Sequence, residues 1–258
     1  MHQTDASIID RSNVQCDVVV VNQCDRDSVE HFSFTNKFGK VCKAIFVCTT
    51  ERGLSKSRNM AISYAPDDSI CLISDDDEFF VDDIEKIVTN AYIENPKAAL
   101  IAFALIRKDL ENGKEYPAEK TNLGFVQILK TSSQQISFKK QACRSSNICF
   151  DENMGSGTGN GGGEENKFLL DFRRAGLKLC YIPQIIATVL PGESKWFHGY
   201  DEKYLKNLGW TSRRSMGRMI GFLYCILWTL RHRHLYKKSG ITEAMALKQL
   251  FSGYIEKR

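Results

Sequence analysis

The chain has 258 residues, enough for one sizeable α/β domain with an appendage. Hydrophobic residues make up 43% and charged residues 26%, which is the mix of a folded soluble protein and excludes a mainly disordered chain. The net charge of +4 is mild, and no basic stripe with interleaved aromatic residues lies outside the C-terminal tail, so we expect no binding to nucleic acid.

Nine cysteines occur, an odd number, and no two form a C-x-x-C pair. Several lie inside apolar runs, which indicates small buried side chains in a reducing compartment rather than a disulfide or zinc framework. The N-terminal residues do not combine a basic segment with an apolar one, as a secretion signal would. The protein is therefore expected in the cytosol.

Strand-like and helix-like segments alternate through the first half, the pattern of βα units that build a mostly parallel sheet flanked by helices. We therefore predict an α/β fold. The predicted strands are residues 16–21, 43–49, 69–74 and 98–107, and the predicted helices are residues 54–64 and 82–94.

The second half is less regular, and its most unusual stretch is the glycine-rich segment 155–163. Such a segment cannot pack a core and is costly to order, so mobility near a ligand is its expected property. Around it we predict strands at 124–129, 179–182 and 185–189, a helix at about 164–175, and a helical, basic chain from about residue 200.

An acidic cluster, Asp75-Asp76-Asp77-Glu78, directly follows the predicted strand 69–74. Ligands bind at the carboxyl edge of such sheets, and crowded carboxylates repel one another unless a cation lies among them. The D-x-D spacing suits Mg²⁺ or Mn²⁺ bridging the diphosphate of a nucleotide. An acidic first turn of the next helix is the alternative, but it explains Asp82 and Asp83 better than the cluster.

Three segments in chain order, GLSKSRN (53–59), ICLISDDD (70–77) and GEE (163–165), resemble the inverting family 2 glycosyltransferases with the GT-A fold. Bacterial members that act on surface polysaccharides are the nearest comparison. The resemblance covers roughly residues 16–205 and implies a GT-A-like domain over 1–205, followed by a basic helical tail over 206–258.

The resemblance implies a reaction and its partners. A sugar would pass from a nucleotide-sugar donor, most directly a UDP-sugar, to a hydroxyl of a polysaccharide or lipid-linked glycan. The implied mechanism is a metal-assisted, inverting displacement.

By the same resemblance, Asp77 would ligate the metal, and Asp75 would reach the metal or the donor ribose. Arg58 and Asn59 would lie in the helix that faces the nucleotide and would bind the donor, Arg58 through the base or the phosphates. Asn22 stands where an aspartate pair commonly reads the uracil, so it is a further donor-binding candidate.

The family's acidic pair at a helix start falls on Glu164 and Glu165. Glu165 is the expected base that deprotonates the acceptor hydroxyl, with Glu164 as second choice. The alternative is that both acids only complement the helix dipole. His198 is a candidate third metal ligand, since some GT-A enzymes take one from a late histidine, although a histidine among aromatic residues is often a packing residue.

The sequence lacks the opening strand of the Ser-Val-Ile-Ile-Pro type that family members normally have. Two alternatives to an active glycosyltransferase stay open. The first is an N-terminally truncated, non-catalytic remnant of such an enzyme. The second is another metal-dependent, nucleotide-using transferase, whose glycine-rich segment would cradle phosphates. Against the second, that segment has no Gly-Lys-Ser/Thr ending and precedes an acidic helix start.

Residues 217–230 are apolar apart from Arg218, and basic residues flank them on both sides: Arg213, Arg214, Arg231, Arg233, Lys237 and Lys238. This segment is shorter than the roughly twenty residues that span a bilayer. Two alternatives remain open. The helix either lies on anionic lipid at the inner face of the cell membrane, near a lipid-linked acceptor, or packs on the catalytic domain with its basic ends solvated.

Overall fold

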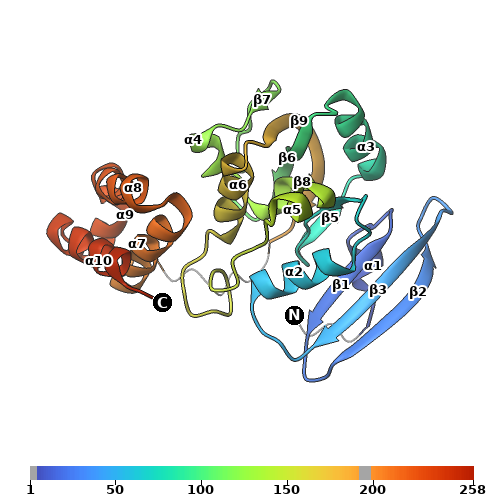
Figure 1. Ribbon diagram of the computed structural model, residues 1–258, viewed down its shortest axis with the longest axis horizontal. Helices are drawn as coiled ribbons and strands as arrows, with labels where there is room; N and C mark the ends of the chain where they lie inside the picture. The colour runs from blue at the N-terminus through green and yellow to red at the C-terminus, as the bar shows by residue number, and fades with distance from the viewer. Residues whose placement is uncertain (1–4, 192–198) are drawn as a thin grey trace. The chain divides into compact units, whose positions relative to one another are not determined.

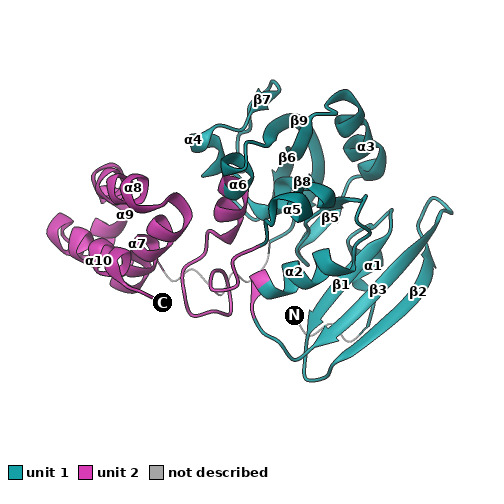
Figure 2. Cartoon of the chain, viewed as in Figure 1, with its two compact units in different colours: residues 1–52, 56–149, 171–192 teal, residues 53–55, 150–170, 193–258 magenta. Residues whose placement is uncertain are grey.

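The computed structural model describes residues 5–191 and 199–258 (Figure 1). The chain forms two compact units, coloured separately in Figure 2. Unit 1 comprises Met1–Arg52, Lys56–Cys149 and Asp171–Gly192, and unit 2 comprises Gly53–Ser55, Phe150–Leu170 and Glu193–Arg258. The expected division at residues 205 and 206 stays a prediction.

The first sheet of unit 1 has the order β1-β3-β2. Strands β1 (Val18–Gln23) and β3 (Val41–Thr49) are parallel and confirm two predicted strands. Strand β2 (Ser28–Thr35) pairs antiparallel with β3 and was not predicted. Its side chains are mostly exposed and it pairs on one side only, so it carries no apolar run.

The second sheet has the order β4-β8-β6-β9-β5, with β7 pairing to β9. Its centre is β6 (Ala98–Arg107), whose first eight residues are all buried, as its apolar sequence predicts. The other strands are β4 (Ile70–Leu72), β5 (Glu78–Phe80), β7 (Thr121–Asn122), β8 (Ile136–Lys139) and β9 (Lys178–Val189).

Strand β9 runs through both short strands predicted at 179–182 and 185–189. Ala102 faces Tyr181 whereas Ala104 faces Ile185, so the residues around Pro183 bulge out of the pairing with β6. The bulge explains why the sequence appears to contain two strands.

The α/β fold class is confirmed, but the pairing is less parallel than predicted. Within the described ranges only β1 with β3 and β6 with β9 pair in parallel, and the other pairs are antiparallel. The strands β2, β5, β7 and β8, which were not predicted, make all of the antiparallel pairs, and β5 and β8 account for most of those in the second sheet. Neither is long enough to show a strand periodicity of its own.

Helices α2 (Leu54–Tyr64), α3 (Ile84–Glu94) and α6 (Glu164–Arg174) agree with the predicted helices. Helix α3 packs on β6 and β9 (Figure 1) through Ile84, Val88 and Tyr92. Shorter helices are α1 (Ile8–Arg11) and α5 (Lys140–Ser146).

The strand predicted at 124–129 is wrong, because this segment forms the one-turn helix α4 (Phe125–Ile128). The Ile128 N–H donates to the Gly124 carbonyl, and the Thr131 hydroxyl donates to that of Gln127. Ile128 is fully buried while Val126 is exposed, so one apolar side chain anchors the turn. A single turn is too short for its helical period to be visible in the sequence.

Unit 2 contains the helices predicted beyond residue 200: α7 (Glu202–Met216), α8 (Arg218–Arg231), α9 (Arg233–Tyr236) and α10 (Glu243–Ile255). Leu205, Cys225, Trp228, Tyr236 and Leu250 are central to its core. Across the described parts of the chain, no helix has the length and apolar character that crossing a bilayer requires.

Helices α7 and α10 approach closely at two glycines. A Cβ on Gly209 would lie 1.9 Å from the Leu250 carbonyl oxygen, and one on Gly253 would lie 1.7 Å from that of Lys206. Backbone atoms cannot move aside as a flexible side chain does, so glycine is required at both positions.

We therefore predict that Gly253→Ala destabilises unit 2 by about 1–3 kcal/mol, because the added methyl group forces the two helices apart. Glycine to alanine in a helix interior normally stabilises by about 0.5–1 kcal/mol, so the sign of the change is diagnostic. Denaturant unfolding would measure it, with the exposed Lys248→Ala in the same helix as control. A Gly253→Ala protein as stable as the wild type would contradict the close approach.

Candidate functional site

The acidic loop, residues 75–77, connects β4 to β5 and is hydrogen-bonded at both ends. The Asp75 backbone N–H donates to the Glu78 carboxyl at 2.8 Å, and the Asp77 carbonyl accepts from the Leu190 N–H at 2.8 Å. These bonds hold the backbone of the D-x-D segment at the end of a strand, where the sequence predicts it.

Glu78, the fourth acid of the cluster, is directed into the protein. Its side chain is buried, and its Oε1 has no hydrogen-bond partner among the described residues. Burial, assisted by the charge of Asp75, raises the pKa of Glu78 well above its ordinary value. Glu78 thus supports the loop backbone from inside the protein and is not one of the exposed acids of the loop.

Asp75 is paired with Arg58 from α2. The Arg58 Nη2 lies 3.2 Å from the Asp75 Oδ1 and 2.8 Å from the Ser133 hydroxyl. The Arg58 side chain is only 6% exposed, so this ion pair is shielded on the arginine side. The structure therefore brings together two residues that the sequence predicts in one site.

Asp77 is held by an amide. The Gln134 Nε2 donates to the Asp77 Oδ1 at 2.8 Å. Burial raises the pKa of Asp77, and the nearby carboxylates of Asp75 and Asp76 raise it further. The loop thus crowds negative charge around a half-buried carboxylate, which is a setting that favours a bound cation.

Ser133, which bonds Arg58, and Gln134, which bonds Asp77, are adjacent in a short 3-10 helix, η1 (Ser133–Gln135). The sequence did not predict this helix. The Gln135 side chain accepts from the Ser132 backbone and donates to the Phe103 carbonyl on β6, so η1 is anchored to the central strand. The Ser-x-x-Gln capping box of 132–135 was the available signal for this turn.

The glycine-rich segment belongs to unit 2 and is hydrogen-bonded along its length. The Ser55 hydroxyl donates to the Met154 carbonyl, the Leu54 N–H to the Ser156 carbonyl, and the Thr158 hydroxyl to the Gly155 carbonyl. The start of α2 therefore lies against the start of this segment.

Glu164 is buried at the start of α6, while Glu165 beside it is half-buried. Gly155 has a φ of +95°, and a Cβ there would lie 3.1 Å from the Glu164 carboxylate. The Glu164 side chain thus packs under the glycine-rich segment, and its neighbour Glu165 is the more accessible of the two acids.

The other predicted site residues lie in different settings. Asn59 follows Arg58 in α2 and is half-buried. Asn22 is buried in β1, and its amide hydrogen-bonds the Cys48 thiol at 3.7 Å. His198 lies outside the described residues. Within the described ranges no group of three or more His, Cys, Asp or Glu side chains is arranged to hold a metal ion. The site assignments therefore stay predictions.

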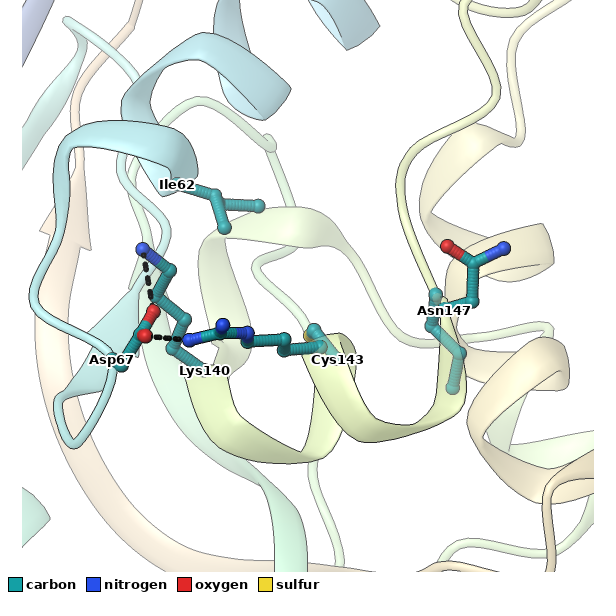
Figure 3. Close-up of a pocket in the computed structure, with 7 residues that line it drawn as sticks. Ile62, Asp67, Lys140, Cys143 and Asn147 are labelled. Carbon is teal, nitrogen blue, oxygen red and sulfur yellow. Dashed lines mark hydrogen bonds and ion pairs between the residues drawn. The ribbon is translucent and has the colours of Figure 1, made fainter.

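A cavity of about 350 Å³ in unit 1 lies by α5 (Figure 3). Asp67 lies in it and forms ion pairs with Lys140 and Arg144, and Ile62 and Cys143 supply apolar walls. None of its lining residues is a predicted site residue.

Comparison with known proteins gives a family match. The family model described as Glycosyl transferase family 2 matches residues 2–152, more than half of the chain. This stretch includes Arg58, Asp75 and Asp77 and ends before Glu164 and Glu165. No curated protein matches the chain.

Among solved structures, the chain is similar to the crystal structure of S. aureus TarS 1-349, with a TM-score of 0.50 and 14% sequence identity. The match covers 93% of this chain and 61% of the TarS chain, so this chain spans less than two thirds of that protein. A likeness at this identity shows the fold alone.

In unit 2, Asp151 connects the chain before the glycine-rich segment to α7. The Arg214 guanidinium donates to both Asp151 oxygens, at 2.6 and 2.8 Å. Burial acts to raise the pKa of Asp151, but the hydrogen bonds from Arg214 and Asn153 outweigh it and the pKa is lowered.

We predict that Arg214→Leu destabilises the protein by about 2 kcal/mol at neutral pH, because it removes a charged, bidentate hydrogen-bonded pair. A lowered pKa means that this contribution is present above the unfolded-state pKa and is lost as the pH falls through the folded-state value. Denaturant unfolding at neutral and acidic pH would measure both effects. Since Arg218 is exposed, Arg218→Leu is the control, and an equal loss at all pH values would contradict the assignment.

Proposed function

Because the chain belongs to glycosyl transferase family 2, we propose that it transfers a sugar from a nucleotide-sugar donor to the hydroxyl of a glycan acceptor. The observation that carries the proposal is the acidic loop of unit 1. Its two D-x-D carboxylates are held at the end of a strand, Asp75 by Arg58 and Asp77 by Gln134. Such pre-arranged oxygen ligands suit a site for the diphosphate of a nucleotide with its metal ion.

The residues present fit Mg²⁺ or Mn²⁺. Mg²⁺ commonly binds through one or two protein carboxylates and completes its shell with water and substrate phosphates, so two aspartates are enough. Asp77 would be the principal ligand and Asp75, whose charge is shared with Arg58, the second. When bound, the ion would neutralise charge on the diphosphate leaving group.

The residues around the loop support this use of the carboxylates. Gln134 donates to one oxygen of Asp77 and thereby fixes the orientation of the other. Arg58 holds Asp75 and is itself fixed by Ser133, so a rotation of either carboxylate would break a hydrogen bond. We therefore propose that Asp75 contacts the donor or the metal ion, and that Arg58 holds Asp75 in position.

Asn22 and Asn59 remain candidates for the nucleoside part of the donor. The Asn22 amide hydrogen-bonds Cys48, so contact with a base would have to replace that weak interaction. Asn59 follows Arg58 directly in α2.

We propose that Glu165 is the base that deprotonates the acceptor hydroxyl. In a single inverting displacement, the base takes the proton of the acceptor hydroxyl while the oxygen attacks the anomeric carbon and the bond to the diphosphate breaks. Glu164 is the less suitable acid, because it is buried against Gly155, whereas Glu165 is half-buried in the first turn of α6.

We predict that Mn²⁺ raises the melting temperature of the wild type and leaves that of Asp77→Asn unchanged. A ligand stabilises the folded state of a protein only if it binds to that state, and Asp77→Asn removes the proposed metal ligand. Asp76→Asn is the matched control, because Asp76 is the neighbouring residue, its side chain is exposed, and the substitution removes the same charge. Gln134→Leu should bind Mn²⁺ about 10–100-fold more weakly, the usual effect of removing a residue that orients a metal ligand. Equal Mn²⁺ shifts in all four proteins would exclude Asp77 as a ligand.

We predict that a panel of nucleotide sugars contains a donor that the protein hydrolyses or transfers in the presence of Mn²⁺, and that Asp77→Ala abolishes this activity. Glu165→Gln should lower the rate by about 10²–10⁴-fold, the usual contribution of a general base, and leave donor affinity unchanged. Isothermal titration with the donor separates the two effects. Full activity in Asp77→Ala would overturn the site, and full activity in Glu165→Gln would overturn only the assignment of the base.

A further inference from the structure

Helix α8 (Figure 1) exposes an apolar face that no described part of the chain covers. Met219, Leu223, Leu227 and Leu230 are 81%, 55%, 64% and 62% exposed. Their spacing of four, four and three residues places them on one side of the helix, which we call the α8 face. Large apolar side chains gathered in this way mark an interaction site.

The opposite side of the same helix is already used. Cys225 and Trp228 are buried in the core of unit 2, where they pack with Leu205, Tyr236 and Leu250. The α8 face is therefore the side of the helix that does not pack in the core of unit 2. The contacts of the buried side fix the orientation of α8 within unit 2.

The segment of chain that contains α8 carries charge of one sign. From Lys203 to Thr242 the chain contains no aspartate or glutamate. Arg218 is exposed at the start of the helix, and Arg231 and Arg233 are exposed at its end. An apolar face with cations at both ends is complementary to a surface that is apolar inside and anionic at its rim.

We propose that the α8 face binds an anionic membrane surface, with the helix lying in the plane of the interface. The helix has 14 residues, a length of about 21 Å at 1.5 Å per residue, which suits lying on a bilayer rather than crossing it. The leucines enter the boundary of the acyl chains, and the arginines at both ends contact lipid phosphates.

A second copy of the chain is a poorer occupant of the same face. A twofold axis would place α8 against the identical helix. In an antiparallel pair Arg218 would face Arg231 and Arg233 of the second copy, and in a parallel pair it would face its own equivalent. Either arrangement sets arginines of the two copies together, and residues 203–242 of each copy contain no aspartate or glutamate that could compensate them.

The inference is independent of the proposed function, because it concerns unit 2 alone and is tested by a binding measurement rather than by activity. If both hold, the enzyme would work at a surface where lipid-linked acceptors are found.

Sedimentation of the full chain with vesicles tests the proposal. We expect the protein to pellet with vesicles of phosphatidylglycerol and phosphatidylcholine at low salt, to pellet poorly with phosphatidylcholine alone, and to bind less as salt screens the arginines. The variant Leu223→Glu/Leu227→Glu should reduce the affinity for the anionic vesicles at least tenfold. Arg231→Glu/Arg233→Glu should remove the preference for phosphatidylglycerol.

The matched control is Val41→Glu/Ile93→Glu, which changes two side chains of unit 1 that are 68% and 69% exposed and should leave vesicle binding unchanged. Circular dichroism melting would establish that each variant is folded. Failure of the wild type to pellet with anionic vesicles would overturn the proposal, as would equal binding by Leu223→Glu/Leu227→Glu. A wild-type dimer in light scattering that this variant dissociates, without any vesicle binding, would show instead that the α8 face joins two copies.

Discussion

The contact between Arg58 and Asp75 is the interaction on which the arrangement of the acidic loop depends. Four neighbouring acids would repel one another, and the structure reduces that repulsion in two ways. A nearly buried guanidinium compensates Asp75, and burial of Glu78 with its raised pKa favours a carboxyl that carries no charge. Two acids remain: Asp76, which is exposed, and Asp77, which is half-buried and whose carboxylate is oriented by the Gln134 amide.

Long elements with a clear period could be predicted from the sequence, because their burial alone fixes the pattern of apolar residues. Strand β6 and helix α2 were predicted with the bounds that the structure has. Elements whose formation depends on distant partners could not. Strand β5 has three residues and exists because β9 offers it a pairing edge, and the turn of α4 is anchored by a single buried side chain, Ile128. Local propensity cannot show either.

The same distinction applies to the candidate site. The D-x-D segment and Arg58 were identifiable because the motif and its strand are continuous in the sequence. Gln134 and Ser133 were not, since nothing in residues 132–135 indicates that Gln134 bonds Asp77, 57 positions earlier, or that Ser133 bonds Arg58, 75 positions earlier. Their capping box predicts a turn, but only the pairing of β8 with β4 and β6 brings that turn to the acidic loop.

The glycine-rich segment shows that composition alone does not reveal every physical reason for a residue. Six glycines in nine positions indicate a segment that is costly to order, and four of them also have a positive φ, which residues with a side chain rarely adopt. Gly155 has a positive φ and a Cβ there would lie 3.1 Å from the Glu164 carboxylate, and Gly157, with a φ of +86°, would place one 3.1 Å from the Gly53 Cα. Here glycine is required by left-handed backbone and close approach, and hydrogen bonds from Ser55 and Leu54 help to offset the entropy of ordering it. The segment leads directly into α6, and Gly155 lies against Glu164, so the segment forms part of the environment of Glu164.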